Sequence, residues 1–394
     1  MNKNTTRLFF IDAIRAWAIL MMLQGHFIDG LLDPIYRDNS NMVYSVWKYF
    51  RGITAPVFFT VSGFIFTYLL IKVPQTGLNN PRVQKGIKRG VQLIFIGYLL
   101  RLNLWGLFKG EIYSSFYFVD VLHCIGLSIL SIIVIYLITS KSKKWLFPTL
   151  MLLATLVLFI FEPYYKTLDY SFLPQWLANY FTKSSGSVFT IIPWLGYTAF
   201  GSFVSILFSK NKEYKYLYTI SIPLFAIIGL ILIYFSSDFF LTLSRVTGVK
   251  LFSDIFFNNY LFIRLGDVLV VFSVFMLFRQ FLTNRTGLRL GQSTLSIYVI
   301  HFIILYGSFT GLGLYAFFHH TLNPWISVTG AIAFMIVCSF LALKYEDRKT
   351  EIKAGANQLL NLLKLQLERF LIIGFSHVRT LSYQLFQLLG LIKN

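Results

Sequence analysis

The chain has 394 residues, of which 56% are hydrophobic, 18% are aromatic and only 13% are charged. The mean hydropathy of +0.66 excludes an ordinary soluble globular protein. The formal net charge of +19 suggests nucleic-acid binding. The placement of the cations along the chain tests this interpretation.

Apolar runs of about 20 residues recur along the sequence, which is the length that crosses roughly 30 Å of hydrocarbon. We therefore predict an all-α, polytopic membrane protein with about ten transmembrane helices, held in the lipid bilayer. The first run is too long and too charged for a signal-peptide core, and we expect it to be retained. The predicted spans are 9–32, 51–72, 88–108, 117–138, 145–162, 187–209, 216–236, 259–282, 289–318 and 325–344.

The Lys and Arg residues between these spans are unevenly distributed. If the N-terminus is cytoplasmic, 19 of them flank the cytoplasmic ends of the spans and eight flank the other ends. The positive-inside rule then predicts that both termini are cytoplasmic. The basic charge is thus mainly an orientation signal, and we expect no nucleic-acid partner. Homo-oligomer formation stays open.

The sequence changes character after the last predicted span. We predict a transmembrane domain at 1–345 and a cytoplasmic tail at 346–394. In the tail, apolar residues recur at helical spacing with charged residues between them, which is typical of an amphipathic helix on a membrane surface. A partner-binding arm is the alternative. The apolar residues are Leu359, Leu360, Leu363, Leu367, Phe370 and Leu371.

The first span carries four polar residues that a lipid-facing helix should not contain. At about 100° per residue, Asp12, Arg15, His26 and Asp29 share one face. Burying an Asp or Arg at the bilayer centre costs roughly 2.5–3.5 kcal/mol, so this face should meet protein or a watery passage. An internal Asp12–Arg15 pair beside a structural histidine is the alternative. If the face lines a passage, cysteines at Ala18 and Leu23 should react with water-soluble reagents.

Polar residues also interrupt other spans. Asp120 and His123 lie one helical turn apart, as do Arg264 and Asp267. A structural salt bridge is the alternative for the second pair. We expect these groups to converge in the outer half of the membrane with Arg101, and we expect His301 nearer the middle.

Five stretches together resemble the transmembrane acyltransferases, the group that contains the acyltransferase-three family and heparan-alpha-glucosaminide N-acetyltransferase. Arg15 and His26 resemble the Arg-x10-His motif of the first of these families. The resemblance runs from about residue 7 to 310, and the order and spacing of the motifs are fairly specific. The stretches are "DAIRAWAILMMLQGH", "APVFFTVSGFIF", "VDVLHCIGLS", "PWLGYTAFG" and "LGQSTLSIYVIH".

The resemblance implies an acyl-CoA-dependent O- or N-acyltransferase of the bacterial type in a bacterial inner membrane. Such an enzyme moves an acyl group, with acetyl expected, from cytoplasmic acetyl-CoA to a hydroxyl or amine of a glycan or glycolipid on the other side. A thioester is already activated, so the enzyme needs mainly a base and a pocket that aligns the acceptor. We predict His26 as the base, oriented by Asp29, with Arg15 beside it in the catalytic set. An acyl-histidine intermediate is the alternative.

The remaining candidate residues divide between the two substrates. Arg and Lys suit the phosphates of coenzyme A, although the positive-inside rule also explains cations at this end. We find no zinc pattern, Walker loop or dinucleotide fingerprint and predict no metal. The predicted donor-binding residues are Arg82, Lys85, Lys88, Arg89 and Ser62. The predicted acceptor-binding residues are Asp120, His123, Arg101, Arg264, Asp267 and His301.

Two other classes of function stay open at this point. A proton-coupled transporter also uses intramembrane Asp, His and Arg, but it typically shows internal symmetry, which this sequence lacks. A polyprenyl-sugar glycosyltransferase needs acidic residues in a large first outer loop, and the loop at 33–50 is short. Binding of acyl-CoA to the purified protein would separate the three classes.

Overall fold

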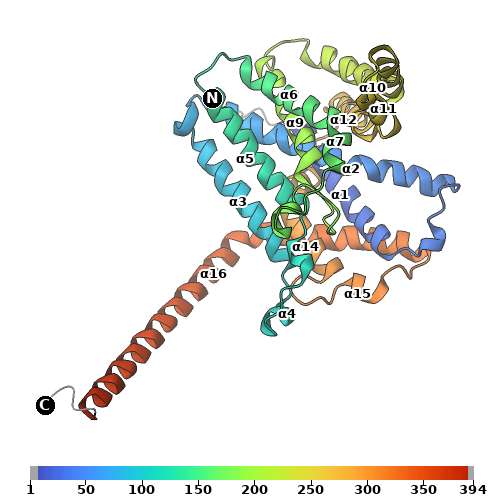
Figure 1. The fold of residues 1–394 in the computed structure, drawn as a ribbon. Helices are drawn as coiled ribbons and strands as arrows, with labels where there is room; N and C mark the ends of the chain where they lie inside the picture. Colours follow the sequence, from blue (N-terminus) through green and yellow to red (C-terminus); the bar gives the residue numbers. More distant parts are fainter. Residues whose placement is uncertain (1–7, 389–394) are drawn as a thin grey trace. The chain divides into compact units, whose positions relative to one another are not determined.

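A computed structural model describes residues 8–388, with side chains through residue 382. All regular elements in this range are helices (Figure 1), which confirms the predicted all-α fold. They divide into two compact units, Met1–Leu341 and Ala342–Asn394. The helices are α1 (Phe9–Leu31), α2 (Met42–Ile71), α3 (Pro81–Arg101), α4 (Leu104–Phe108), α5 (Val121–Thr139), α6 (Leu146–Ile160), α7 (Glu162–Thr167), α8 (Gln175–Ala178), α9 (Ile191–Lys210), α10 (Leu217–Thr247), α11 (Lys250–Phe257), α12 (Tyr260–Leu277), α13 (Arg285–Gln292), α14 (Thr294–Tyr306), α15 (Leu314–Phe318) and α16 (Pro324–Leu388). Three 3₁₀ turns connect them: η1 (Pro34–Tyr36), η2 (Gly77–Asn79) and η3 (Ser114–Tyr117).

Each of the ten predicted spans corresponds to helix, but fewer helices are long and apolar enough to cross a membrane. Among the described residues seven qualify, or eight if the pair α13 and α14, bent by 72°, is one broken span. α6 has 15 residues and is about 22 Å long, shorter than the hydrocarbon layer. α3 begins with a cluster of basic residues that lowers its hydropathy. The chain is an integral membrane protein, and the prediction of about ten spans exceeds this number.

The helices of the first unit pack in pairs through glycine. α2 and α9 touch so closely that a Cβ at Gly63 would collide with the carbonyl of Thr198, and a Cβ at Gly201 with that of Thr60. Since lipid tails are as apolar as leucine, helices in membranes associate largely by such close backbone packing. The α2–α9 contact is therefore a rigid element of the bundle.

Two further helix pairs repeat this arrangement. α3 and α5 meet at Gly90 and Gly126, where a Cβ on either glycine would lie 2.9 or 2.6 Å from the carbonyl oxygen of the other. α10 and α12 meet in the same way at Gly229 and Gly266, with 2.8 and 2.6 Å. Figure 1 shows α3 beside α5 and α10 beside α12. α1 packs on α13, where Gly291 lies against the backbone carbonyl of Asp12.

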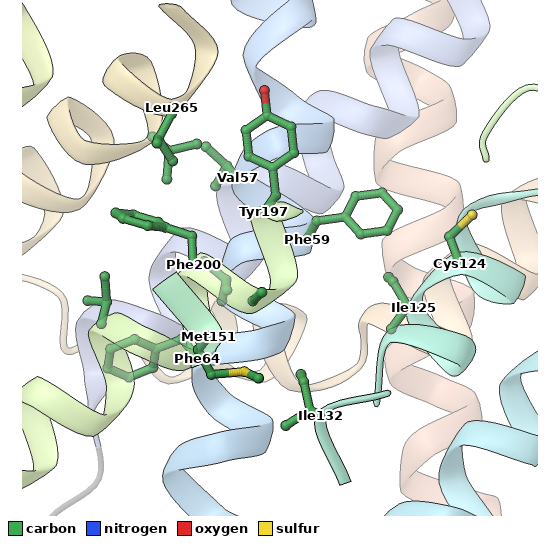
Figure 2. Close-up of a cluster of buried hydrophobic side chains, with 14 of the residues drawn as sticks. Val57, Phe59, Phe64, Cys124, Ile125, Ile132, Met151, Tyr197, Phe200 and Leu265 are labelled. Carbon is green, nitrogen blue, oxygen red and sulfur yellow. The ribbon is translucent and has the colours of Figure 1, made fainter. Parts of the chain in front are cut away.

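A single hydrophobic core joins the pairs. Figure 2 shows residues of this core from five helices: Phe59 of α2, Ile125 of α5, Met151 of α6, Tyr197 of α9 and Leu265 of α12. Phe59, Tyr197 and Met151 are fully buried. The core therefore fixes α2, α5 and α9 against one another.

The second unit consists, as far as it is described, of the helical residues 342–388 of α16. The six apolar residues of the predicted amphipathic face, Leu359 to Leu371, are all exposed. Their binding to a membrane surface stays a prediction. The end of the predicted tail, 389–394, lies outside the described residues.

Candidate functional site

A cavity of about 230 Å³ in the first unit is lined by His26. α1 contributes Met21, Met22 and Gly25 next to this histidine, and α2 contributes Arg51 on the facing wall. We call this space the histidine cavity. The other lining residues are Gly52, Thr54, Ala55, Phe58, Phe59, Val121, Phe189, Trp194 and Tyr298.

The imidazole of His26 is held from α14. His301 Nε2 lies 3.4 Å from His26 Nδ1, and the Tyr306 hydroxyl lies 3.3 Å from the same nitrogen. His301 is fully buried, whereas His26 is partly exposed. Since both contacts fall on Nδ1, Nε2 is the ring nitrogen left for a substrate in the histidine cavity.

Asp29 has a different partner from the one expected. Its carboxylate forms an ion pair with Arg51 of α2, and its backbone carbonyl accepts a hydrogen bond of 2.7 Å from Arg37. The described contacts of the His26 ring nitrogen are with His301 and Tyr306, and Asp29 is not among them. Arg51 lines the histidine cavity, so the Asp29 carboxylate is connected to the cavity through its ion pair with this guanidinium.

A second cavity, of about 280 Å³, contains Arg15 and Arg89. We call it the arginine cavity. Arg15 Nη2 donates a 3.0 Å hydrogen bond to the Thr294 hydroxyl, and its Nη1 lies 3.7 Å from Asp12 Oδ1. Ser62 also lines this cavity, which brings together three of the predicted site residues. The remaining lining is apolar apart from Thr294 and Tyr298: Phe58, Ile65, Phe66, Leu69, Leu93, Leu122, Ile125, Ile129 and Leu295.

The two cavities meet at two residues. Phe58 of α2 and Tyr298 of α14 line both of them. Ala18 and Leu23, by contrast, are fully buried in the core and line neither cavity. The face of α1 that borders open space therefore runs through Arg15, Met22 and His26, and the expectation for Ala18 and Leu23 was wrong.

The other predicted donor-binding cations lie outside the arginine cavity. Lys85 and Lys88 are exposed on α3, and Arg82 is partly exposed near its start. Asn80 caps this helix by accepting a hydrogen bond from the Arg82 backbone N–H. Of the four basic residues in this part of α3, Arg89 is the one whose side chain lines the cavity.

Asp120, His123 and Arg101 form a buried cluster at the start of α5. Arg101 donates hydrogen bonds of 3.1 and 2.7 Å to Asp120 Oδ2, and the Asp120 backbone N–H donates to His123 Nδ1 over 3.1 Å. His123 packs edge-on against Tyr98 with ring centroids 4.3 Å apart. None of the three lines the histidine cavity, whereas Val121, which follows Asp120 in the sequence, does. This geometry is that of a helix cap and a structural ion pair.

Arg264 and Asp267 form a second buried pair, on α12. Arg264 Nη1 lies 2.8 Å from Asp267 Oδ2, and the Tyr49 hydroxyl donates a 2.6 Å hydrogen bond to the other carboxylate oxygen. The guanidinium packs behind Gly52, where a Cβ would lie 2.7 Å from Nη2. The pair thus supports the wall of the histidine cavity from behind and does not line it.

A third cavity, of about 510 Å³, adjoins the histidine cavity at Trp194. We call it the lysine cavity, because Lys166 and Lys183 line it. Lys166 Nζ lies 3.2 Å from Glu162 Oε1. Tyrosine and hydroxyl side chains complete a polar and aromatic surface: Tyr165, Tyr260, Thr182, Ser184 and Thr190, with Phe181, Ile192 and Pro193.

Sequence reasoning missed several residues that shape the site. Tyr298 and Tyr306 lie three residues before and five after His301, so the former stood inside a quoted motif without being singled out. Arg51 is the first residue of a predicted span, at 51–72, and nothing in the sequence separates it from the cations that flank the spans. The tilted ring contact of Trp194 with Phe59, with centroids 5.1 Å apart, joins residues from two helices and has no local sequence signal.

Among the described residues, no group of three or more His, Cys, Asp or Glu side chains is arranged to hold a metal ion. The family model for the catalytic domain of heparan-alpha-glucosaminide N-acetyltransferase matches residues 7–238, which is more than half of the chain. The matched segment includes α1, α2, α3, α5 and α9, which carry most of the residues that line the three cavities. No curated protein matches the chain.

Proposed function

The chain belongs to the family of the heparan-alpha-glucosaminide N-acetyltransferase catalytic domain, and from this membership we propose that it transfers an acetyl group from cytoplasmic acetyl-CoA to a glycan on the other side of the membrane. Members of this family are transmembrane acetyltransferases. The acceptor group is an amine or a hydroxyl of a carbohydrate or glycolipid. The observation that carries the proposal is the meeting of the histidine and arginine cavities at Phe58 and Tyr298.

The arginine cavity suits the donor. Coenzyme A is polyanionic at its nucleotide end, and Arg89 and Arg15 offer guanidinium groups to phosphate oxygens. The apolar lining beyond them suits the uncharged pantetheine arm. Arg15 and His26 are separated by eleven residues of α1, or about 16 Å of rise, which an extended pantetheine arm spans. A nucleotide held near Arg89 would thus present its thioester close to His26.

The lysine cavity suits the acceptor. Aromatic side chains stack on sugar rings, and hydroxyl, carboxylate and ammonium groups bond to sugar hydroxyls. Trp194 lines both this cavity and the histidine cavity, so a sugar bound there has a short route to His26. Entering substrates would therefore approach the same histidine from two sides.

The proposed reaction needs one base. His26 Nε2 takes the proton of the acceptor amine or hydroxyl. At the same time the nitrogen or oxygen of the acceptor attacks the carbonyl carbon of the thioester. The new C–N or C–O bond forms, the C–S bond breaks, and the proton passes to the departing coenzyme A thiolate. In the alternative route His26 itself carries the acetyl group between donor and acceptor.

We propose that the start of α1 and the end of α16 face the cytoplasm of a bacterial cell and that the membrane is the inner one. The support is the excess of Lys and Arg at that end of the predicted spans. This orientation puts the arginine cavity toward the cytoplasmic supply of acetyl-CoA. It puts the lysine cavity toward the glycans outside.

The test uses purified full-length protein in liposomes with radiolabelled acetyl-CoA and glucosamine as the acceptor. We expect saturable acetyl-CoA binding and transfer of label to glucosamine, which neither a transporter nor a glycosyltransferase would give. His26→Ala should lower transfer by roughly 10²–10⁴-fold, the usual loss for a positioned acid–base group. His377→Ala, at an exposed histidine of α16, is the matched control and should transfer normally. Near-normal transfer by folded His26→Ala would contradict the proposed role.

A further inference from the structure

Tyr298 lines both the histidine cavity and the arginine cavity. The side chain is 2% exposed, and its oxygen is buried with no hydrogen-bond partner among the described residues. A phenylalanine would fill the same space without leaving a polar atom unpaired, and an unpaired buried hydroxyl is destabilising. Because the side chain lines both cavities, a ligand bound in one of them is the candidate partner for this hydroxyl.

The neighbours of Tyr298 on α14 define its place along the passage. Thr294, four residues earlier, accepts the hydrogen bond from Arg15, and His301, three residues later, contacts His26. Residues spaced by three and four share one face of a helix. Tyr298 thus lies between the two residues of α1 that bracket the proposed path of the pantetheine arm.

The other hydroxyl side chains that line the histidine and arginine cavities are already engaged. Thr54 donates to the Phe50 carbonyl, Ser62 donates to the Phe58 carbonyl, and Thr294 accepts from Arg15. The Tyr306 hydroxyl lies 3.3 Å from His26 Nδ1. Among these described hydroxyls, Tyr298 is the one without a protein partner.

We propose that the Tyr298 hydroxyl donates a hydrogen bond to the carbonyl oxygen of the acyl thioester and stabilises the oxyanion that forms there; this rests on the proposed acetyl transfer. When the acceptor nitrogen or oxygen attacks, the π electrons of the carbonyl move to its oxygen. The Tyr298 hydroxyl keeps its proton and strengthens its hydrogen bond to the negative oxygen. The carbonyl then re-forms, the C–S bond breaks, and the thiolate takes the proton that His26 removed from the acceptor.

The test compares Tyr298→Phe with Tyr68→Phe. Tyr68 is another buried tyrosine, on α2, and lines none of the three cavities. Each protein is measured for thermal stability, acetyl-CoA affinity and acetyl transfer at saturating donor. Loss of one oxyanion donor typically costs about 10²–10³-fold in kcat. We expect that loss for Tyr298→Phe with donor affinity lowered by no more than about tenfold, the usual net effect of one hydrogen bond, and wild-type values for Tyr68→Phe.

A spectroscopic readout separates this role from a structural one. With acetyl-CoA isotope-labelled at the thioester carbonyl, the infrared band of the bound donor should lie at lower frequency than in buffer, because the hydrogen bond weakens the C=O bond. In Tyr298→Phe the band should return toward its position in buffer. In Tyr68→Phe it should match the wild-type band.

The outcomes distinguish this proposal from the one on which it rests. If the wild-type protein transfers acetyl groups while Tyr298→Phe keeps normal turnover and an unchanged carbonyl band, the oxyanion role is overturned and the proposed function stands. If the whole loss of activity is a loss of donor affinity, the oxyanion role is likewise overturned. If the wild-type protein neither binds acetyl-CoA nor transfers its acetyl group, both proposals are overturned.

Discussion

Nε2 of His301 lies 3.4 Å from Nδ1 of His26, so a residue of α14 sets the orientation of the imidazole that α1 places in the histidine cavity. Tyr306 reinforces this contact at 3.3 Å from the same nitrogen. The two contacts fix which face of the ring meets the open space. The proposed base is thus positioned by a pair of α14 residues that themselves need not touch a substrate.

The first prediction concerns this positioning. Combining His301→Phe with Tyr306→Phe should leave His26 in place but free to rotate, and misplacement of a reacting group by about 1 Å can cost about 10²-fold. We therefore expect kcat to fall while the affinity for acetyl-CoA stays unchanged. The loss should be smaller than that of His26→Ala. Wild-type kcat in a folded double variant would show that α14 does not orient the histidine.

The second prediction concerns the donor. Arg89 lines the arginine cavity, whereas Lys72 caps the end of α2 and lines none of the three cavities. Arg89→Ala should weaken acetyl-CoA binding by about tenfold, or about 1.4 kcal/mol, because a guanidinium–phosphate contact is lost. Lys72→Ala should bind like the wild type. Titration calorimetry on the detergent-solubilised protein measures both. Equal affinities of the two variants would mean that the α3 cations set the orientation in the membrane and do not bind the donor.

The third prediction concerns the passage. In a protein lacking Cys124 and Cys338, a cysteine at Met22 should react with a water-soluble thiol reagent, because Met22 lines the histidine cavity. A cysteine at the adjacent, fully buried Leu23 should be protected. Mass spectrometry of the labelled protein gives the extent of reaction. Protection of both positions would mean that no water reaches this face of α1.

The fourth prediction concerns the glycine contact between α2 and α9. In an open helix position, Gly→Ala stabilises by roughly 0.5–1 kcal/mol, so Gly355→Ala, where a Cβ meets nothing, should raise stability slightly. Gly201→Ala should lower it, because the Cβ would collide with the Thr60 carbonyl and overpacking costs about 1–3 kcal/mol. Thermal unfolding in detergent compares the two. A higher unfolding temperature for both variants would argue against the close contact between α2 and α9.

The fifth prediction is that the ion pair between Asp120 and Arg101 stabilises the fold and does not bind the acceptor. Arg101→Ala leaves the Asp120 carboxylate buried without its guanidinium, and breaking a buried pair in this way costs about 3–5 kcal/mol. We expect a lower unfolding temperature and normal KM values per folded molecule. An increase in the acceptor KM at unchanged stability would instead restore the acceptor-binding role that the sequence suggested.

The helices were predictable because hydrophobic runs of membrane-spanning length depend on local composition. The polar face of α1 was predictable for the same reason, since helical spacing fixes which residues share a face. The residues of other helices that contact this face of α1 were not predictable. Asp12 packs on α13 and Asp29 pairs with Arg51, although both share the stripe with the cavity-lining Arg15 and His26.

The partners of the site residues come from distant parts of the chain. His301 reaches His26 across 275 residues, and no periodicity in either helix encodes that contact. Arg101 and Asp120 were expected to be close, and they form an ion pair at the start of α5, while their predicted role in acceptor binding stays a prediction. Depth in the membrane, which the sequence gives, does not distinguish a residue that lines a cavity from one that supports its wall.

The glycine contacts have a consequence for how substrates get in and out. The pairs α2–α9 and α3–α5 pack backbone against backbone at their glycines, so separating either pair would remove these contacts. The histidine and arginine cavities lie along the seam between these two pairs, closed by α1 and α14. α1 is held in the same way, because Gly291 of α13 lies against the Asp12 carbonyl. Substrate entry therefore has to leave three backbone-to-backbone helix contacts intact.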